Sequence, residues 1–154
     1  ISESNLEIIN RITKLLKFNN RAKTFLVKNK KSKDLNFDKK FDLILSMGVL
    51  HHSPYSKQII SNLKSFLRTD GIFLVMLYNK HYKKKLSLKR GYTINNETFG
   101  ELTDPIGNGL KNPFSEDFDD KKVLELFGDD FNLIKSNYPT LDYNFYEFIY
   151  QPNS

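Results

Sequence analysis

The chain has 154 residues, enough for one domain with a sizeable hydrophobic core. Cysteine is absent, which excludes disulfides and thiolate metal sites and fits a reducing, cytoplasmic setting. The net charge of +6 is uneven: residues 1–90 carry 20 Lys and Arg against 6 Asp and Glu, and residues 91–154 carry 4 against 12.

This charge distribution permits a nucleic-acid surface, but the sequence carries no nucleic-acid-binding motif. Lys, Asn and Ile are abundant throughout, so general compositional bias accounts for much of the basic character. No apolar run approaches the ~20 residues of a membrane-spanning helix. We therefore expect neither a nucleic-acid partner nor a membrane span.

The first predicted elements are a helix over residues 4–18 and a short strand over Lys23–Val27. The helix is predicted from apolar residues at helical spacing, and the strand from its β-forming side chains. A charged connection follows over Lys28–Lys40. The apolar residues of the helix are Leu6, Ile9, Ile12, Leu15 and Leu16.

The central stretch is Phe41–Pro54, in which a short apolar run leads to small residues, two histidines and a Ser-Pro pair. The apolar run predicts an interior parallel strand that is buried on both faces. Ser53 is a suitable N-cap and Pro54 a suitable first helical residue. Because α/β sheets bind ligands beyond the carboxyl ends of their strands, the segment Ser46–His52 is the expected ligand site.

Downstream, the pattern predicts a helix that ends at Asp70-Gly71 and a second buried strand over Ile72–Leu77. The span Tyr78–Phe114 is rich in Gly and Pro and is expected to be irregular, giving an insertion at about residues 78–118. A short helix over 119–127 and two strands, Phe131–Ile134 and Tyr146–Tyr150, close the chain; the last is expected to be antiparallel near an edge. The alternation of strands and helices predicts one α/β domain over residues 1–154.

At this point the sequence resembles a known family. The run Phe41–Pro54, with Val-Leu-His-His at residues 49–52, looks like the fourth strand and following turn of class I S-adenosylmethionine-dependent methyltransferases. The segment Leu67–Val75 is similar to the turn and fifth strand of that family, although Arg-Thr-Asp-Gly replaces its usual Lys-Pro-Gly-Gly. The resemblance extends over nearly the whole chain.

The resemblance implies a Rossmann-like, mostly parallel sheet with helices on both faces and an antiparallel C-terminal strand. Ile1–Ser4 looks like the segment just after the family's second strand, so the first strand, Gly-rich loop and second strand are expected to be missing. The chain would then be the C-terminal part of a methyltransferase domain in a longer protein. Alone, it is expected to be inactive.

For the cofactor, S-adenosylmethionine, the resemblance implies contacts from Ser46, Met47, Gly48 and Val49, largely through main chain. The family's adenine-binding pair falls on Lys31 and Ser32. A lysine cannot accept a hydrogen bond from the adenine amino group, so Asn29 is an alternative to Lys31.

Two histidines stand at the expected site. His52 is a candidate proton acceptor and His51 a candidate substrate contact, because an imidazole titrates near neutral pH. Both could instead hold the turn through hydrogen bonds to main chain. Tyr78, Asn79 and His81 follow the next strand and are further candidates for facing an acceptor, or else belong to a solvated loop. No metal site is expected, since no carboxylate accompanies the histidines at ligand spacing.

The function that the resemblance implies is methyl transfer from S-adenosylmethionine to a small-molecule acceptor. An alternative is a catalytically inactive α/β binding or scaffold domain, which Lys31 favours. A third reading is an RNA methyltransferase, which the basic half permits. Residues 104–118 resemble a segment that closes over the active site in several of these enzymes.

Overall fold

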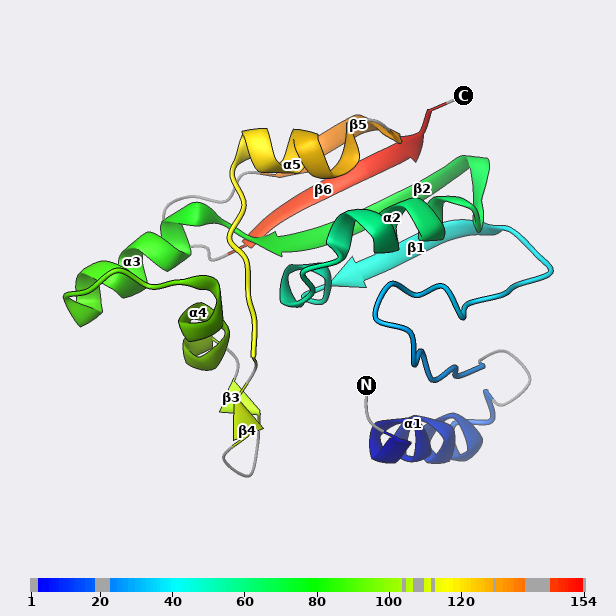
Figure 1. Ribbon diagram of the computed structural model, residues 1–154. Coiled ribbons are helices and arrows are strands. Elements are labelled where there is room, and N and C mark those ends of the chain that lie inside the picture. Colours follow the sequence, from blue (N-terminus) through cyan, green and yellow to red (C-terminus); the bar gives the residue numbers. More distant parts are fainter. Residues whose placement is uncertain are drawn as a thin grey trace. The chain divides into compact units, whose positions relative to one another are not determined.

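The computed structural model describes residues 3–18, 23–103, 105–106, 110–111, 113–128, 130–137 and 145–153 (Figure 1). The chain divides into two compact units, Ile1–Asn36 and Phe37–Ser154. The predicted ligand-binding strand lies in the second unit. Each unit is described by itself.

The first unit contains helix α1, Glu3–Leu15, close to the predicted bounds. The strand predicted over Lys23–Val27 is wrong, because residues 23–28 have no regular secondary structure. A strand is stabilised by its hydrogen-bonded neighbour, and no pairing between described strands includes these residues. Local β propensity alone therefore did not make the segment a strand.

The second unit is built on a four-stranded sheet with the order β1-β2-β6-β5 (Figure 1). Its strands are β1, Phe41–Met47; β2, Leu67–Tyr78; β5, Phe131–Asn137; and β6, Phe145–Pro152. β1 and β2 are parallel, whereas β6 is antiparallel to both β2 and β5. The α/β class is confirmed, as is the antiparallel final strand, but that strand is interior and β5 forms the edge.

Two helices, α2 (Ser56–Lys64) and α5 (Asp120–Phe127), pack on one face of this sheet. Phe73 on β2 contacts Phe127 of α5, with ring centroids 5.8 Å apart. Phe127 also stacks on Tyr150 of β6 at 4.1 Å. Apolar residues from β2, β5, β6 and both helices thus form one continuous core.

The predicted burial of β1 on both faces is wrong. Its side chains on the face opposite the helices, Leu43, Leu45 and Met47, are 45–59% exposed. In the described sheet β1 is also an edge strand, since β2 is its only neighbour there. An apolar run of this kind predicts burial, but burial requires packing elements on both sides.

The helix after β1 ends at Lys64, not at the predicted Asp70-Gly71. Leu67 is already in β2, where it pairs with Phe41 and is 3% exposed. An added Cβ on Gly71 would lie 2.9 Å from the Leu67 side chain, so this glycine permits close packing inside a strand. The turn chemistry of Asp-Gly was therefore misread as a helix stop.

The span expected to be irregular contains two helices, α3 (Lys80–Arg90) and α4 (Asn96–Thr103), and a two-stranded ribbon of β3 (Pro105–Ile106) and β4 (Leu110–Lys111). Tyr78, Ile94 and Phe99 form a second small core there. α3 is rich in Lys and Arg, which are good helix formers. It has too few apolar residues to show a helical spacing, so the sequence pattern did not predict it. In the part of the chain that the structure describes, no helix is both long and apolar enough to cross a membrane.

The two faces of the sheet give a direct stability test. Leu77 is fully buried in the core, whereas Leu45 is 59% exposed on the opposite face. We expect Leu77→Ala to lower the free energy of unfolding by about 2–5 kcal/mol, because it leaves a cavity. Leu45→Ala, the matched control, should change it by about 0.5 kcal/mol or less. Urea unfolding measures both; equal losses would contradict the described core.

Candidate functional site

The carboxyl end of β1 turns sharply at Gly48, whose φ is +71°. Ser46, two residues before Gly48, is buried, while Met47 and Val49 on either side of Gly48 are 45% and 61% exposed. An L-residue is disfavoured at such a φ, so the turn requires glycine or a residue that tolerates the left-handed region. The turn of residues 46–49, here called the ledge, therefore lies beside the end of β2, where Met47 pairs with Met76.

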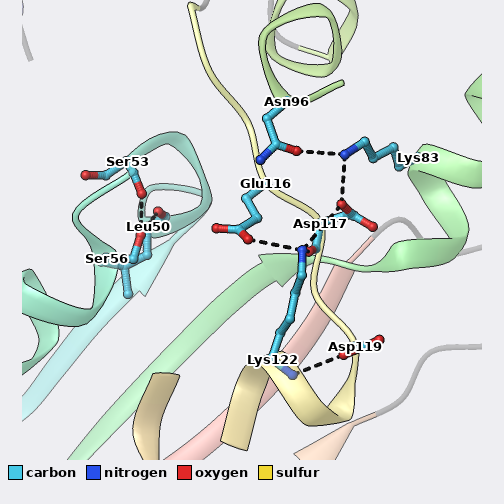
Figure 2. Close-up of polar contacts among 9 residues, drawn as sticks. All are labelled: Leu50, Ser53, Ser56, Lys83, Asn96, Glu116, Asp117, Asp119 and Lys122. Atoms are coloured by element: carbon cyan, nitrogen blue, oxygen red, sulfur yellow. Dashed lines mark hydrogen bonds and ion pairs between the residues drawn. The ribbon is translucent and has the colours of Figure 1, made fainter. Parts of the chain in front are cut away.

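After the ledge, Leu50–His52 form the 3₁₀ helix η1. The prediction that Ser53 caps the next helix and Pro54 begins it is wrong, since α2 starts at Ser56 and has no side-chain cap. Instead, Ser56 Oγ lies 2.5 Å from Leu50 O and 2.6 Å from Ser53 O (Figure 2). This hydroxyl ties η1 to α2 and fixes the entry of the helix.

His51 is buried, with 1% of its surface exposed. Its Nδ1 accepts a hydrogen bond from Tyr78 N at 3.3 Å, and its ring lies 3.9 Å from the Tyr78 ring. Burial, and next the neighbouring His52, lower the pKa of His51 from 6.5 to about 3. His51 is therefore neutral at physiological pH and connects β2 to the turn after β1.

His52 is half-buried and has a different set of contacts. Its Nδ1 lies 2.6 Å from Ser115 Oγ and 3.3 Å from the Phe114 carbonyl oxygen. These two partners come from the segment before α5. One ring nitrogen of His52 is thus engaged by residues more than 60 positions away in sequence.

The segment 113–118, here called the strap, runs past the carboxyl end of β2 (Figure 1). Main-chain hydrogen bonds join it to η1 and to the end of β2: Glu116 N donates to His51 O at 2.8 Å, and Phe118 N donates to Tyr78 O at 2.9 Å. Lys80 N in turn donates to Phe118 O at 2.9 Å. The strap therefore fixes the positions of both histidines.

Ion pairs reinforce the strap (Figure 2). Lys83 Nζ lies 3.1 Å from Asp117 Oδ1 and 2.7 Å from Asn96 Oδ1, which links α3, α4 and the strap. Lys122 Nζ lies 3.0 Å from Glu116 Oε1. Because the side chains of Lys83 and Asp117 are each only 18% exposed, this pair is less screened by water than a surface pair.

Tyr78, Asn79 and His81 were also predicted to face the methyl acceptor, and the first two make contacts within the protein. Tyr78 is 4% exposed and packs against Phe99, and Asn79 is 2% exposed. The Asn79 side chain accepts from Tyr82 N at 3.0 Å and so caps α3. His81 is exposed on α3. Their role toward an acceptor stays a prediction.

The predicted adenine-contacting residues lie in a turn of the first unit. Lys31 N donates to Asn29 Oδ1 at 2.9 Å, and Ser32 adopts a φ of +57°. The Asp34 carboxylate accepts from the main-chain N–H groups of Lys28 and Asn29, and the bond from Asn29 chiefly lowers the pKa of Asp34. Asp34 thus holds the turn that carries Asn29 and Lys31, a role the sequence interpretation missed.

The sequence also gave no indication of Phe114 and Ser115. Their contact with His52 depends on chain folding across more than 60 residues, and a serine in a loop has no local signature for it. The resemblance of residues 104–118 to a closing segment was the only signal in that region. Residues 104, 107–109 and 112 lie outside the described residues.

Two surface hollows lie elsewhere. One of about 300 Å³ is lined by Leu74, Lys135, Ser136, Glu147 and Ile149 on the sheet face opposite the helices. Another of about 350 Å³ includes Lys40, Lys64 and Asp130 in its lining. Neither is lined by residues 46–52. Among the described residues, no cluster of three or more His, Asp or Glu side chains could hold a metal ion.

Residues 1–130 match a protein family described as "Methyltransferase domain". Since the match spans most of the chain, the chain belongs to this methyltransferase family. The resemblance to class I S-adenosylmethionine-dependent methyltransferases is thereby confirmed, and S-adenosylmethionine is the cofactor of that class. No curated protein sequence matches the chain significantly.

Solved structures share the fold. The PH0226 protein of Pyrococcus horikoshii OT3 has 17% identity and a TM-score of 0.68, covering 99% of this chain and 69% of its own. An S-adenosylmethionine-dependent methyltransferase of Clostridium acetobutylicum has 13% identity and a TM-score of 0.67, covering 97% and 72%. The 1,6-didemethyltoxoflavin-N1-methyltransferase of Burkholderia thailandensis, solved with 1,6-didemethyltoxoflavin and S-adenosylhomocysteine, has 15% identity and a TM-score of 0.62, covering 100% and 59%.

The Gly48 turn predicts a specific sensitivity. An added Cβ would lie 3.4 Å from Met76 Cε, an ordinary contact, so the cost of Gly48→Ala comes from its positive φ. We expect a loss of about 1–2 kcal/mol in the free energy of unfolding. Gly48→Asn should cost less, because asparagine tolerates the left-handed region. Chemical denaturation of the three proteins measures this order, and equal stability of Gly48→Ala and wild type would contradict the turn.

The low pKa of His51 predicts a pH dependence of stability. Unfolding restores a pKa near 6.5, so below that pH the unfolded state binds a proton at His51 that the folded state does not. The contribution to stability is complete above pH 6.5 and is lost as the pH falls toward 3. We expect a loss of up to about 1.4 kcal/mol per pH unit in this range.

The measurement is urea unfolding at several pH values between 7.5 and 4.5. His51→Gln should have a shallower decline than wild type, because it lacks the titrating group. His81→Gln, at an exposed position on α3, is the matched control and should decline as wild type does. A wild-type slope preserved in His51→Gln would refute the buried neutral imidazole.

Proposed function

We propose that this chain forms part of a longer enzyme that transfers a methyl group from S-adenosylmethionine to a small-molecule acceptor. The observation that carries this proposal is the Gly48 ledge at the carboxyl end of β1, within a chain of the methyltransferase family. A ligand beyond this strand end would meet main chain and small side chains. That is the general position of ligands in open α/β sheets.

The ledge fits a part of the cofactor. Gly48 has no side chain to block access, and Val49 offers exposed apolar surface next to it. In this proposal Ser46, Met47, Gly48 and Val49 contact the cofactor through main chain and apolar surface.

The residues predicted to contact the adenine are Asn29, Lys31 and Ser32. Asn29 is the better acceptor, because Lys31 has only donors. Asn29 Oδ1 already accepts from Lys31 N, but an amide oxygen has two lone pairs, so one remains for the adenine amino group. Ser32 follows in the same turn.

The cofactor supplies an activated methyl group, so the protein contributes mainly in-line placement and exclusion of water. His52 is the proposed acceptor of the proton that a protonated nucleophile must lose. It suits this role better than His51, which is buried and engaged with Tyr78 N. The small-molecule acceptor is supported by the Burkholderia relative, whose structure holds such a substrate.

The proposal predicts cofactor binding that depends on the ledge. Isothermal titration calorimetry with S-adenosylhomocysteine is made on the protein as its gene encodes it, with any residues before Ile1. We expect binding, and we expect Val49→Glu to weaken it at least about tenfold, because a carboxylate would be desolvated against the ligand.

Leu133→Glu is the matched control, since Leu133 is 44% exposed on β5, at the opposite edge of the sheet. It should bind as wild type does. Absence of binding by the wild-type protein would remove the activity and favour a scaffold role. Equal weakening by both variants would remove the assignment to the ledge.

A further inference from the structure

The contact between His52 and the strap has a defined polarity. The Phe114 carbonyl oxygen can only accept a hydrogen bond, and it lies 3.3 Å from His52 Nδ1. For this contact to be attractive, Nδ1 must carry the proton. Nε2 then keeps its lone pair.

The hydroxyl groups beyond His52 lead to the same assignment. Thr103 Oγ1 lies 2.8 Å from Phe99 O, and because a carbonyl only accepts, the Thr103 hydroxyl is the donor. Thr103 Oγ1 can therefore serve only as acceptor toward Ser115 Oγ, at 3.5 Å. The Ser115 hydroxyl can then donate to Thr103 Oγ1 and accept from His52 Nδ1 at 2.6 Å, in agreement with the polarity that the Phe114 carbonyl requires.

Both sides of this contact are fixed by main chain. Ser115 has no exposed surface, and its N donates to Asn96 O at 2.9 Å. The next residue, Glu116, donates from N to His51 O at 2.8 Å. Ser115 is therefore held against His52 and is itself too buried to reach a substrate.

The rings of His51 and Tyr78 pack beside His52. The His51 ring, 4.1 Å away between centroids, is neutral, and the Tyr78 ring lies edge-on at 5.7 Å. Neither brings a charge to one side of the imidazole at neutral pH. The Phe114 carbonyl oxygen and Ser115 Oγ at Nδ1 favour the Nδ1-protonated tautomer.

We infer that Ser115 is a positioning residue that, with the Phe114 carbonyl, holds His52 in the Nδ1-protonated tautomer and leaves Nε2 as the basic atom. Its bearing on catalysis rests on the proposed function, in which His52 takes a proton from the acceptor. The tautomer itself is a property of the folded chain without cofactor. It can be tested without activity.

The test is ¹⁵N NMR of the histidine rings at pH 8, where the shifts of Nδ1 and Nε2 distinguish protonated from unprotonated nitrogen. In the wild-type protein we expect His52 to be protonated at Nδ1. Ser115→Ala should move both shifts toward exchange between tautomers. Ser136→Ala, on β5, should leave them unchanged.

Thr103→Val is a second variant that does not touch His52. It frees the Ser115 hydroxyl to donate to Nδ1, so it should also shift His52 toward the Nε2-protonated form. A wild-type ring protonated at Nε2, or identical His52 shifts in wild type and Ser115→Ala, would overturn the inference. The Thr103→Val result keeps the test decisive if Ser115→Ala fails to fold.

A kinetic comparison separates this inference from the proposed function. If methyl transfer is observed, Ser115→Ala should lower kcat about tenfold with little change in KM, because it disturbs the base and not binding. Unchanged kcat would overturn the positioning role. Absence of cofactor binding would remove the proposed function and leave the tautomer result intact.

Discussion

The parallel pairing of β1 with β2 is the interaction on which the rest of this structure depends. It places Met47 beside Met76, so the chain leaves β1 next to the point where β2 ends. Two stretches of sequence that are about 30 residues apart thereby meet at one edge of the sheet. The Gly48 turn follows the end of β1, and the strap is hydrogen-bonded to His51 and Tyr78 beside it.

The two adjacent histidines illustrate how tertiary packing separates residues that look alike in sequence. His51 is directed into the protein, accepts from Tyr78 N and stays neutral. His52 is half-buried and is engaged by the strap through Nδ1. The first is therefore joined to β2 by a main-chain donor, whereas the second is joined to the segment before α5.

The strap is held by several weak interactions of different kinds. Main-chain hydrogen bonds set its register against η1 and the end of β2, and the Lys83–Asp117 pair connects it to α3. None of these needs to be strong alone, since together they leave the segment few alternative arrangements. A buried hydroxyl such as Ser115 can act on His52 only because the surrounding main chain fixes its position.

The sequence by itself determined the α/β class, the strand and turn that contain Gly48, and the methyltransferase resemblance, because these depend on local apolar runs and short motifs. It failed at residues 23–27, whose β-forming side chains pair with no described strand, and at the lysine-rich α3, whose few apolar residues give no helical pattern. Only the tertiary structure decided that β1 lies at an edge of the described sheet, that His51 is buried, and that Ser115 reaches His52. These are contacts between distant parts of the chain, and their geometry is set by packing, which no single segment encodes.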